Sequence, residues 1–141
     1  DLGIFSPTTT QTGTSVMSAS TNAGFGYVIT LSGSTLASGA NTIPAMTGAA
    51  STTGTSQFGT NLKANTTPAV GANVTGLGSG AAVGAYNTAD SFKFNTGDTL
   101  ASASGPTKSN LFTNSYIVNV GGDQAAGVYT STMTYICTAT F

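Results

Sequence analysis

The sequence predicts an all-β fold, a β-sandwich or jelly roll with essentially no helix, and three observations support this prediction. Apolar and polar residues alternate with a period of two in several short segments, as in half-buried strands. Clusters of glycine and asparagine, which favour turns, separate these segments. No window of the 141 residues has apolar side chains at helical spacing. About seven such strands are typical of two packed antiparallel sheets.

Strand signals in the first half of the chain begin with the segment 14–19, where small and apolar residues alternate. Apolar side chains then occupy every second position from 25 to 31, which predicts a strand with one buried face. Leu36 and Ile43 flank a turn of small residues, and a further one-sided strand is expected at 58–64. Each of these segments is therefore predicted to place one face in a core.

Strand signals in the second half are strongest at the C-terminus. Phe92 and Phe94 lie two residues apart, and apolar residues alternate over 112–120 with Ile117 on the opposite face. From 129 to 141 the odd positions are mostly apolar and the even positions mostly threonine. A strand of that length spans roughly 40 Å at about 3.3 Å per residue. We expect it to bend between two sheets or to extend beyond its own domain.

Two stretches, 47–55 and 65–89, lack strand signals and are expected to be loops. The second is long for an unstructured connection within a compact domain. It is interpreted as a segment that packs on a neighbouring molecule, as a ligand loop or as a flexible surface insertion. Its glycine-rich run 76–80 lacks the Lys-Ser/Thr pair of a phosphate-binding loop.

The predicted core consists of the side chains on the apolar faces of these strands. Cys137 is expected to be a small buried hydrophobe, with an intermolecular disulfide or a disulfide to a leader segment as the alternative. The predicted core residues are Phe25, Tyr27, Ile29, Leu31, Phe58, Leu62, Phe92, Phe94, Tyr116, Val118, Tyr129, Met133 and Tyr135.

The composition excludes several classes of function. Only three residues are basic and four are acidic, and the chain contains no arginine, glutamate, histidine or tryptophan. Nucleic-acid binding needs clustered positive charge, whereas zinc sites and Ser-His-Asp triads need histidine or several cysteines. We therefore expect no enzyme activity, no cofactor, no metal site and no nucleic-acid partner.

Asp90 and Asp98 lie near one another in the sequence and flank one predicted strand. A hairpin would bring them together as an acid/base pair or, with Asn87 and Asn95, as a calcium site. Aspartates at such positions more often bond to the backbone of their own turns, and we expect that role here.

The expected surface carries hydroxyl and amide groups in place of charges, since 27 of the 141 residues are threonine. This composition is typical of secreted surface proteins, because hydroxyl hydrogen bonds depend less on salt than charge pairs do. The chain starts at Asp1, which indicates a processed product, and no apolar run is long enough to span a membrane. Asn65 and Asn73 begin Asn-X-Thr sequons in the long loop and are the candidate sites for surface glycans.

The chain is divided into an N-terminal extension, residues 1–12, and a single sandwich domain, residues 13–141, with a long loop at about 65–89. The extension begins with a short apolar segment, which the run 6–10 of serine, proline and threonine separates from the domain. This arrangement predicts a donor strand that leaves its own domain and lies in a groove of a neighbouring subunit.

Leu2, Ile4 and Phe5 are the candidate residues of this donor strand. In an extended strand Leu2 and Ile4 lie on one face and Phe5 on the other, so the first two are expected to be the anchors. Pro7 supports extension because it favours an extended residue before it and cannot donate a ladder hydrogen bond. The alternative is that this segment is the first strand of its own domain.

The run Ala126–Tyr135 resembles a pattern in the last long strand of several secreted bacterial β-sandwich proteins, among them spore-coat-U-like pilins, WxL-type cell-wall domains and other fimbrial subunits. The stretches Thr21–Thr30 and Phe58–Leu62 look similar to surface proteins of this style. The resemblance implies an immunoglobulin-like or pilin-like sandwich that is secreted and exposed at the cell surface. The chain departs from usher-assembled pilins in having no paired cysteines.

The sequence therefore predicts a structural subunit of an extracellular filament, a pilus or matrix fibre, that polymerises with copies of itself by β-strand addition. Nearly uncharged subunits stack without like-charge repulsion. One alternative is a monomeric adhesive or carbohydrate-binding surface domain, with Tyr86 or Tyr116 as an exposed aromatic. A further alternative is a virion capsid or decoration protein built on a jelly roll.

Overall fold

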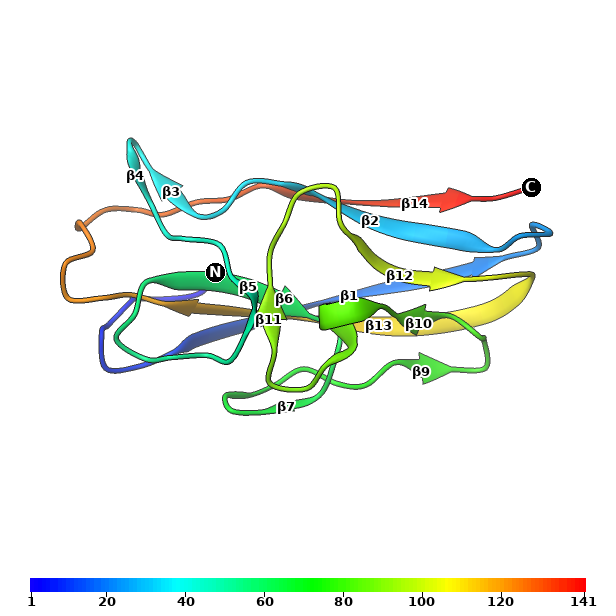
Figure 1. Ribbon diagram of the computed structural model, residues 1–141, viewed down its shortest axis with the longest axis horizontal. Helices are drawn as coiled ribbons and strands as arrows, with labels where there is room; N and C mark the ends of the chain where they lie inside the picture. Colours follow the sequence, from blue (N-terminus) through cyan, green and yellow to red (C-terminus); the bar gives the residue numbers. More distant parts are fainter.

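Two antiparallel β-sheets pack face to face in the computed structural model, which describes residues 1–141, so the predicted β-sandwich is confirmed (Figure 1). The longer strands run along the long axis of the molecule, and the C-terminus lies at one end of that axis. The one helical segment is the single-turn 3-10 helix η1 (Gly84–Asn87).

The larger sheet has six strands and is built around β13 (Thr107–Asn119), which pairs with neighbours on both sides. Its path in space is β1 (Gln11–Thr21), β13, β6 (Gln57–Asn61), β11 (Phe92–Lys93) and β5 (Thr47–Ala49), with β9 (Thr75–Gly76) also beside β13. The register of β1 and β13 places Met17 opposite Phe112, so the odd-numbered residues of β1 face the second sheet.

The smaller sheet has four strands, and β2 lies in its interior. Its order in space is β10 (Ala81–Ala82), β12 (Thr99–Ala103), β2 (Tyr27–Gly33) and β14 (Met133–Ala139). Two short hairpins complete the fold. They are β3 (Ala37–Ser38) with β4 (Asn41–Thr42), and β7 (Asn65–Thr66) with β8 (Ala69–Val70).

The main core lies between the sheets and consists of inward side chains of the alternating strands. Tyr27, Ile29 and Leu31 of β2 are buried, and the rings of Phe58 and Phe94 pack with 5.2 Å between their centroids. The burial of these residues confirms the predicted inward faces of β2 and β6. The other predicted core residues that are buried are Leu62, Phe92 and Val118.

A second, smaller apolar cluster covers the outer face of the larger sheet. Ile117 of β13 is fully buried there against Met46 and Phe92, with the partly buried Val70 beside them. Phe92 and Phe94 would share a face in a regular strand, but the pairing of β11 with β5 shifts register after Phe92. Phe94 therefore joins the main core while Phe92 joins this outer cluster.

The prediction that Phe25 is buried is wrong, because its side chain is 68% exposed. Gly26 has a φ of 81° and turns the chain just before β2 begins, so the alternation does not extend back to Phe25. A side chain at Gly26 would also place its Cβ 1.9 Å from the carbonyl oxygen of Ala103. Only glycine fits this turn, and the turn leaves Phe25 in solvent.

The C-terminal strand predicted over residues 129–141 is shorter in the structure. β14 has seven residues, and the stretch 129–132 before it is an extended segment outside the sheet. Thr130 forms an isolated bridge in which it exchanges two backbone hydrogen bonds of 2.9 Å with Ala37. The threonine alternation therefore continues through a segment that has only one point of pairing.

The two predicted loops carry short strands and pack on their own domain. The first contains β5, and in the second β9 pairs with β13 while β10 pairs with β12. Helix η1 in the second loop buries Tyr86 in the main core. The interpretation of 65–89 as a structureless insertion is therefore wrong, because its residues complete both sheets and part of the core.

β1 ends the larger sheet and β14 ends the smaller one, with β5 and β10 at the opposite ends. Side-chain hydrogen bonds show that β1 and β14 lie on the same side of the sandwich. Tyr135 of β14 bonds through its hydroxyl to Asn114 and Tyr116 of β13, and Tyr116 bonds to Ser15 of β1 at 2.7 Å. Neither sheet fully covers the other along this side. Four residues predicted to be buried are therefore only half-buried: Tyr116, Tyr129, Met133 and Tyr135.

Candidate functional site

A groove of about 1020 Å³ opens between the free edges of the two sheets. Gly13 of β1 lines one wall, and Met133 of β14 with residues 124–131 lines the other. Phe58 and Tyr116, from neighbouring strands of the larger sheet, form its base. A free edge leaves alternate backbone N–H and C=O groups unpaired, so this groove combines apolar walls with main-chain bonding capacity.

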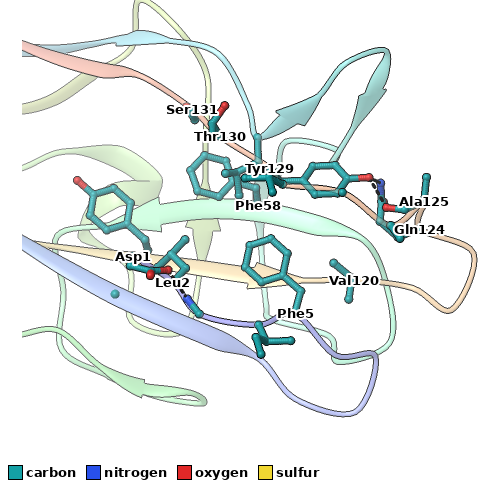
Figure 2. A pocket seen from close by; sticks show the side chains of 18 of the residues that line it. Asp1, Leu2, Phe5, Phe58, Val120, Gln124, Ala125, Tyr129, Thr130 and Ser131 are labelled. Carbon is teal, nitrogen blue, oxygen red and sulfur yellow. Dashed lines mark hydrogen bonds between the residues drawn. The ribbon is translucent and has the colours of Figure 1, made fainter.

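The chain's own N-terminal segment, residues 1–5, occupies one end of the groove (Figure 2). Leu2 and Phe5 pack against the main core, and the ring centroid of Phe5 lies 6.4 Å from that of Tyr129. Tyr129 is held in place because its hydroxyl accepts a hydrogen bond of 2.7 Å from Gln124 Nε2. An apolar segment of the same chain therefore already lines the groove at this end, and the space of about 1020 Å³ lies beside that segment.

A tight turn brings the N-terminal segment back along β1. Ser6 and Thr9 form an isolated antiparallel bridge across Pro7, with a Thr9 N to Ser6 O distance of 3.3 Å. Gln11 Nε2 then donates to the carbonyl oxygen of Ile4 at 2.9 Å. The segment thus lies beside the first residues of β1 and runs antiparallel to them.

The structure places the three predicted donor-strand residues differently from the expected alternation. Leu2 and Phe5 face the groove, whereas the side chain of Ile4 is 90% exposed. Gly3 has a φ of 75°, a conformation that interrupts an extended strand, so residues 2 and 5 share a face in place of residues 2 and 4. Within its own chain the segment therefore pairs Leu2 with Phe5, and the prediction of Leu2 and Ile4 as anchors in a neighbouring subunit stays a prediction.

Side chains alone hold the N-terminal segment. No residue from Asp1 to Phe5 makes a backbone-to-backbone hydrogen bond. Apart from the bond from Gln11, its one further hydrogen bond is internal, from Gly3 N to Asp1 Oδ1 at 2.8 Å. The main-chain edges of β1 and β14 therefore remain unpaired even where the segment lies between them.

Toward the C-terminal end of β14 the inner face of this edge strand is uncovered. Tyr135 points inward, so Cys137 lies on the same face of β14, and its cross-strand neighbour Ile29 is buried in the core. Cys137 is nevertheless exposed, so the prediction of a buried cysteine is wrong. No other strand covers β14 here, because β14 ends the sheet. Its role in an intermolecular disulfide stays a prediction.

A chain of hydroxyl and amide groups crosses the groove between the two halves. It runs from Ser15 through Tyr116 and Tyr135 to Asn114, whose oxygen accepts from Thr60. Burial raises the pKa of Tyr135, and the hydrogen bond with Tyr116 raises it further. The Tyr135 phenol therefore stays neutral and serves as a hydrogen-bonding group.

Asp90 closes the long loop and takes no part in the groove. Its carboxylate accepts hydrogen bonds from Thr66 N and Thr67 N, both at 2.8 Å, and from Thr66 Oγ1 at 2.7 Å. The backbone bonds from Thr67 lead the causes that lower the pKa of Asp90. These backbone groups belong to the hairpin of β7 and β8, so the prediction that Asp90 bonds to the backbone of its own turn is wrong.

Asp98 has a separate set of partners. Burial raises its pKa, but bonds from Lys93, Asn95 and Tyr86 outweigh that effect and lower the pKa below its usual value. The Lys93 Nζ to Asp98 Oδ2 distance is 2.7 Å, and Tyr86 donates to the same oxygen at 2.9 Å. The two aspartates therefore have different local partners and do not form a catalytic or calcium-binding pair.

The alternative sites, for a metal ion and for a sugar, are absent or already take part in contacts within the chain. No group of three or more His, Cys, Asp or Glu side chains comes together to hold a metal ion. Tyr86 is buried and Tyr116 is half-buried and hydrogen-bonded, so neither offers a free ring for stacking on a sugar. The structure contains no helix that is both long and apolar enough to cross a membrane.

The two sequons lie in different surroundings. The Nδ2 atom of Asn65 donates to Asn61 Oδ1 at 2.9 Å and to Lys63 O at 2.8 Å in a buried pocket, where a glycan has no space. Asn73 is exposed, and its oxygen accepts a bond of 3.2 Å from Ala64 N. Asn73 therefore stays the candidate for glycosylation in the folded domain.

Comparison of the chain with protein-family models, with curated proteins and with solved structures gives no match. The resemblance to fimbrial subunits therefore stays a prediction, and the functional argument depends on the groove itself.

Two groove residues that the sequence analysis missed are Gly13 and Gln11. The Cβ of any larger residue at position 13 would lie 2.6 Å from Leu2 Cδ2, so this glycine makes the seat of Leu2. A glycine at the start of a strand is a recognised signal of close approach by another segment. Gln11 gives no comparable signal, because its bond to the carbonyl oxygen of Ile4 depends on the turn between them.

Proposed function

We propose that this protein is a structural subunit of an extracellular filament, and that it assembles by adding an extended segment of a second copy to the groove between β1 and β14. The observation that carries the proposal is the presence of two free edge strands on one side of the sandwich, with an apolar groove between them. An added strand there would pair with both edges and cover the core, as in β-strand addition generally.

The state of the edge strands supports this proposal. Soluble sandwiches normally protect free edges with charges, prolines or inward-pointing lysines. β1 and β14 contain no charged residue and no proline. Several of their inward residues are half-buried or exposed, among them Met17 and Cys137, although Ala19 is buried. Edges left open in this way favour pairing with another chain.

The charge content supports self-association over binding to a charged partner. The formal net charge is -1, with three basic and four acidic residues in the chain. Like copies therefore approach one another without strong repulsion, and the contact depends little on salt. The threonine-rich surface and the absence of histidine agree with an extracellular location, where pH and salt vary.

The experiment compares two single substitutions on neighbouring positions of β14. Cys137→Lys places a charge on the inward face of β14, which an added strand would cover, and should abolish assembly. Ile136→Lys places the same charge on the outer face, where the native side chain is 47% exposed, and should leave assembly intact. Both native positions are exposed, so neither variant should lose much stability as a monomer.

The readout is the length and number of fibres in negative-stain images, with sedimentation velocity as a function of protein concentration. Wild type and Ile136→Lys should form fibres of one diameter, and Cys137→Lys should remain monomeric. Equal assembly of both variants would contradict addition at this groove. Monomeric wild type under all conditions would contradict the filament and favour a monomeric surface domain, and closed shells would favour a virion protein.

A further inference from the structure

We infer that the segment exchanged between copies is residues 1–5, and that in the monomer this same segment plugs its own groove. The inference rests on the proposed function for its biological role, but its evidence is the seat that the segment occupies in the structure. The partner of the groove is then a second copy of the N-terminal segment, anchored by Leu2 and Phe5.

The seat is specific to the residues that occupy it. Leu2 fills a notch that exists because residue 13 is glycine, with Leu2 Cδ2 only 2.6 Å from the position of a Cβ there. Phe5 packs on Tyr129 with a 43° angle between the rings. Both side chains contact the main core, so the groove recognises this segment by shape and not by charge (Figure 2).

The turn between the N-terminal segment and β1 can open without displacing β1. Residues 6–9 form a turn with one long backbone bond of 3.3 Å, whereas Thr10 is tied to the body by a bond of 2.5 Å to Asn119 Oδ1. Opening the turn therefore frees residues 1–9 and leaves β1 in place. Pro7 favours an extended backbone in the opened form, which directs the segment away from its own domain.

Exchange keeps the contacts of the plug and adds new ones. A second copy's segment can place Leu2 and Phe5 in the same seats, so the apolar contacts are conserved. The edges of β1 and β14 have unpaired main-chain groups that the monomer's segment does not use. A donor that is no longer bound by the turn at 6–9 can pair with them through the residues that follow Phe5, while the bend at Gly3 keeps Leu2 and Phe5 on one face. Because donor and acceptor are different surfaces, repeated exchange gives an open chain of subunits.

The plug also predicts how assembly is restrained. A short linker holds the segment at an effective concentration of about a millimolar near its own groove. At lower protein concentration the monomer's own segment therefore outcompetes a second copy for the seat of Leu2 and Phe5. When the chain's own segment is kept out of its seat, a separate segment should bind the groove more tightly. The increase in affinity should equal the reciprocal of the fraction of wild-type molecules whose seat is free.

The test measures binding of a synthetic peptide copying residues 1–10, labelled with a fluorophore at its C-terminus, by fluorescence polarisation. The acceptor is the full-length double variant Leu2→Asp/Phe5→Asp, whose own segment cannot occupy the apolar seat. Wild type and the full-length variant Ile4→Asp are the controls, because Ile4 is exposed and its substitution leaves the plug in place. The single variant Phe5→Asp repeats the comparison with one added charge.

We expect the peptide to bind the double variant at least tenfold more tightly than it binds wild type or Ile4→Asp. Adding Gly13→Leu to the double variant should abolish binding, and a peptide carrying Leu2→Asp and Phe5→Asp should not bind. Equal affinity for all forms, or no binding to the double variant, overturns the inference. If wild type forms fibres while the peptide binds none of the variants, the proposed exchange of residues 1–5 is wrong, but the proposed filament is supported. If the peptide binds as expected but wild type never assembles, the proposed filament is wrong, but recognition of the N-terminal segment by its seat is supported.

Discussion

Amide side chains take the structural role that ion pairs have in more highly charged proteins. The chain has one salt bridge, between Lys93 and Asp98. Elsewhere Asn61 and Asn65 bond to each other in both directions, at 2.7 and 2.9 Å, and Asn65 also accepts from Asp90 N at 2.8 Å. Buried amides with all their partners present fix strand and loop positions without depending on pH or salt.

Asn65→Ala tests this role of the buried amides. The substitution removes the partner of the partly buried backbone N–H of Asp90 and one partner of the buried Asn61 side chain, which keeps its bonds to Thr88 O and Ser91 O. An unsatisfied buried group costs about 1–3 kcal/mol, so we expect a loss of about 1–3 kcal/mol in unfolding free energy. Asn73→Ala, at an exposed position of the same loop, should change it by less than about 0.5 kcal/mol. Urea denaturation measures both; a loss below about 1 kcal/mol for Asn65→Ala contradicts this role.

At the scale of elements, alternation predicted the inward faces of β2 and β13 because side-chain period follows directly from strand geometry. It predicted too long a strand at β14, because threonine alternates over residues 129–132 as well. Only a pairing partner distinguishes a strand from an extended segment. It misplaced Phe25 and Ile4 because Gly26 and Gly3 adopt positive φ values that reset the alternation beside them. The sequence shows the glycines but not which φ the tertiary structure imposes.

Phe94 and Phe25 form a matched pair for testing this assignment of faces. Phe94 is buried against Phe58, so Phe94→Ala should lower the unfolding free energy by about 3–5 kcal/mol. Phe25 is mostly exposed, so Phe25→Ala should lower it by less than about 1 kcal/mol. Chemical denaturation of both variants gives the comparison. Similar losses for the two would show that Phe25 packs in the core and that the turn at Gly26 is misassigned.

The groove was only partly predictable, because it depends on elements that are distant in sequence. The apolar segment at the N-terminus is visible in the sequence, and so is its separation from the domain by Pro7 and its threonine neighbours. Its seat requires β13 to pair with β1 and β14 to end the other sheet, which no local pattern encodes. Tyr129 contacts Phe5 from the irregular segment before β14. The alternation of residues 129–141 had predicted a strand position for it.

For the whole molecule, few titrating groups are linked to folding. Asp90 and Asp98 have lowered pKa values, so the stability that they contribute is present above about pH 4 and is lost as the pH falls further. Tyr86 and Tyr135 have raised pKa values, so their contribution is present below about pH 10 and is lost as the pH rises above it.

These directions predict a plateau of stability between pH 5 and 9. The melting temperature should vary by less than about 10 °C across that window, since the chain has no histidine to titrate within it. Thermal unfolding followed by circular dichroism at constant ionic strength measures it. A larger change would reveal a titrating group whose folded-state pKa lies inside the window.

In the assembly, the groove has two proposed states: its seat holds the chain's own segment in the monomer, and the segment of a second copy in the filament. The most direct measurement is a cryo-electron microscopy reconstruction of the assembled protein. We predict density between β1 and β14 that connects through residues 6–10 to the neighbouring subunit, with Leu2 beside Gly13. Density that connects back to the same subunit's own β1, or a groove left empty in the assembly, would contradict it.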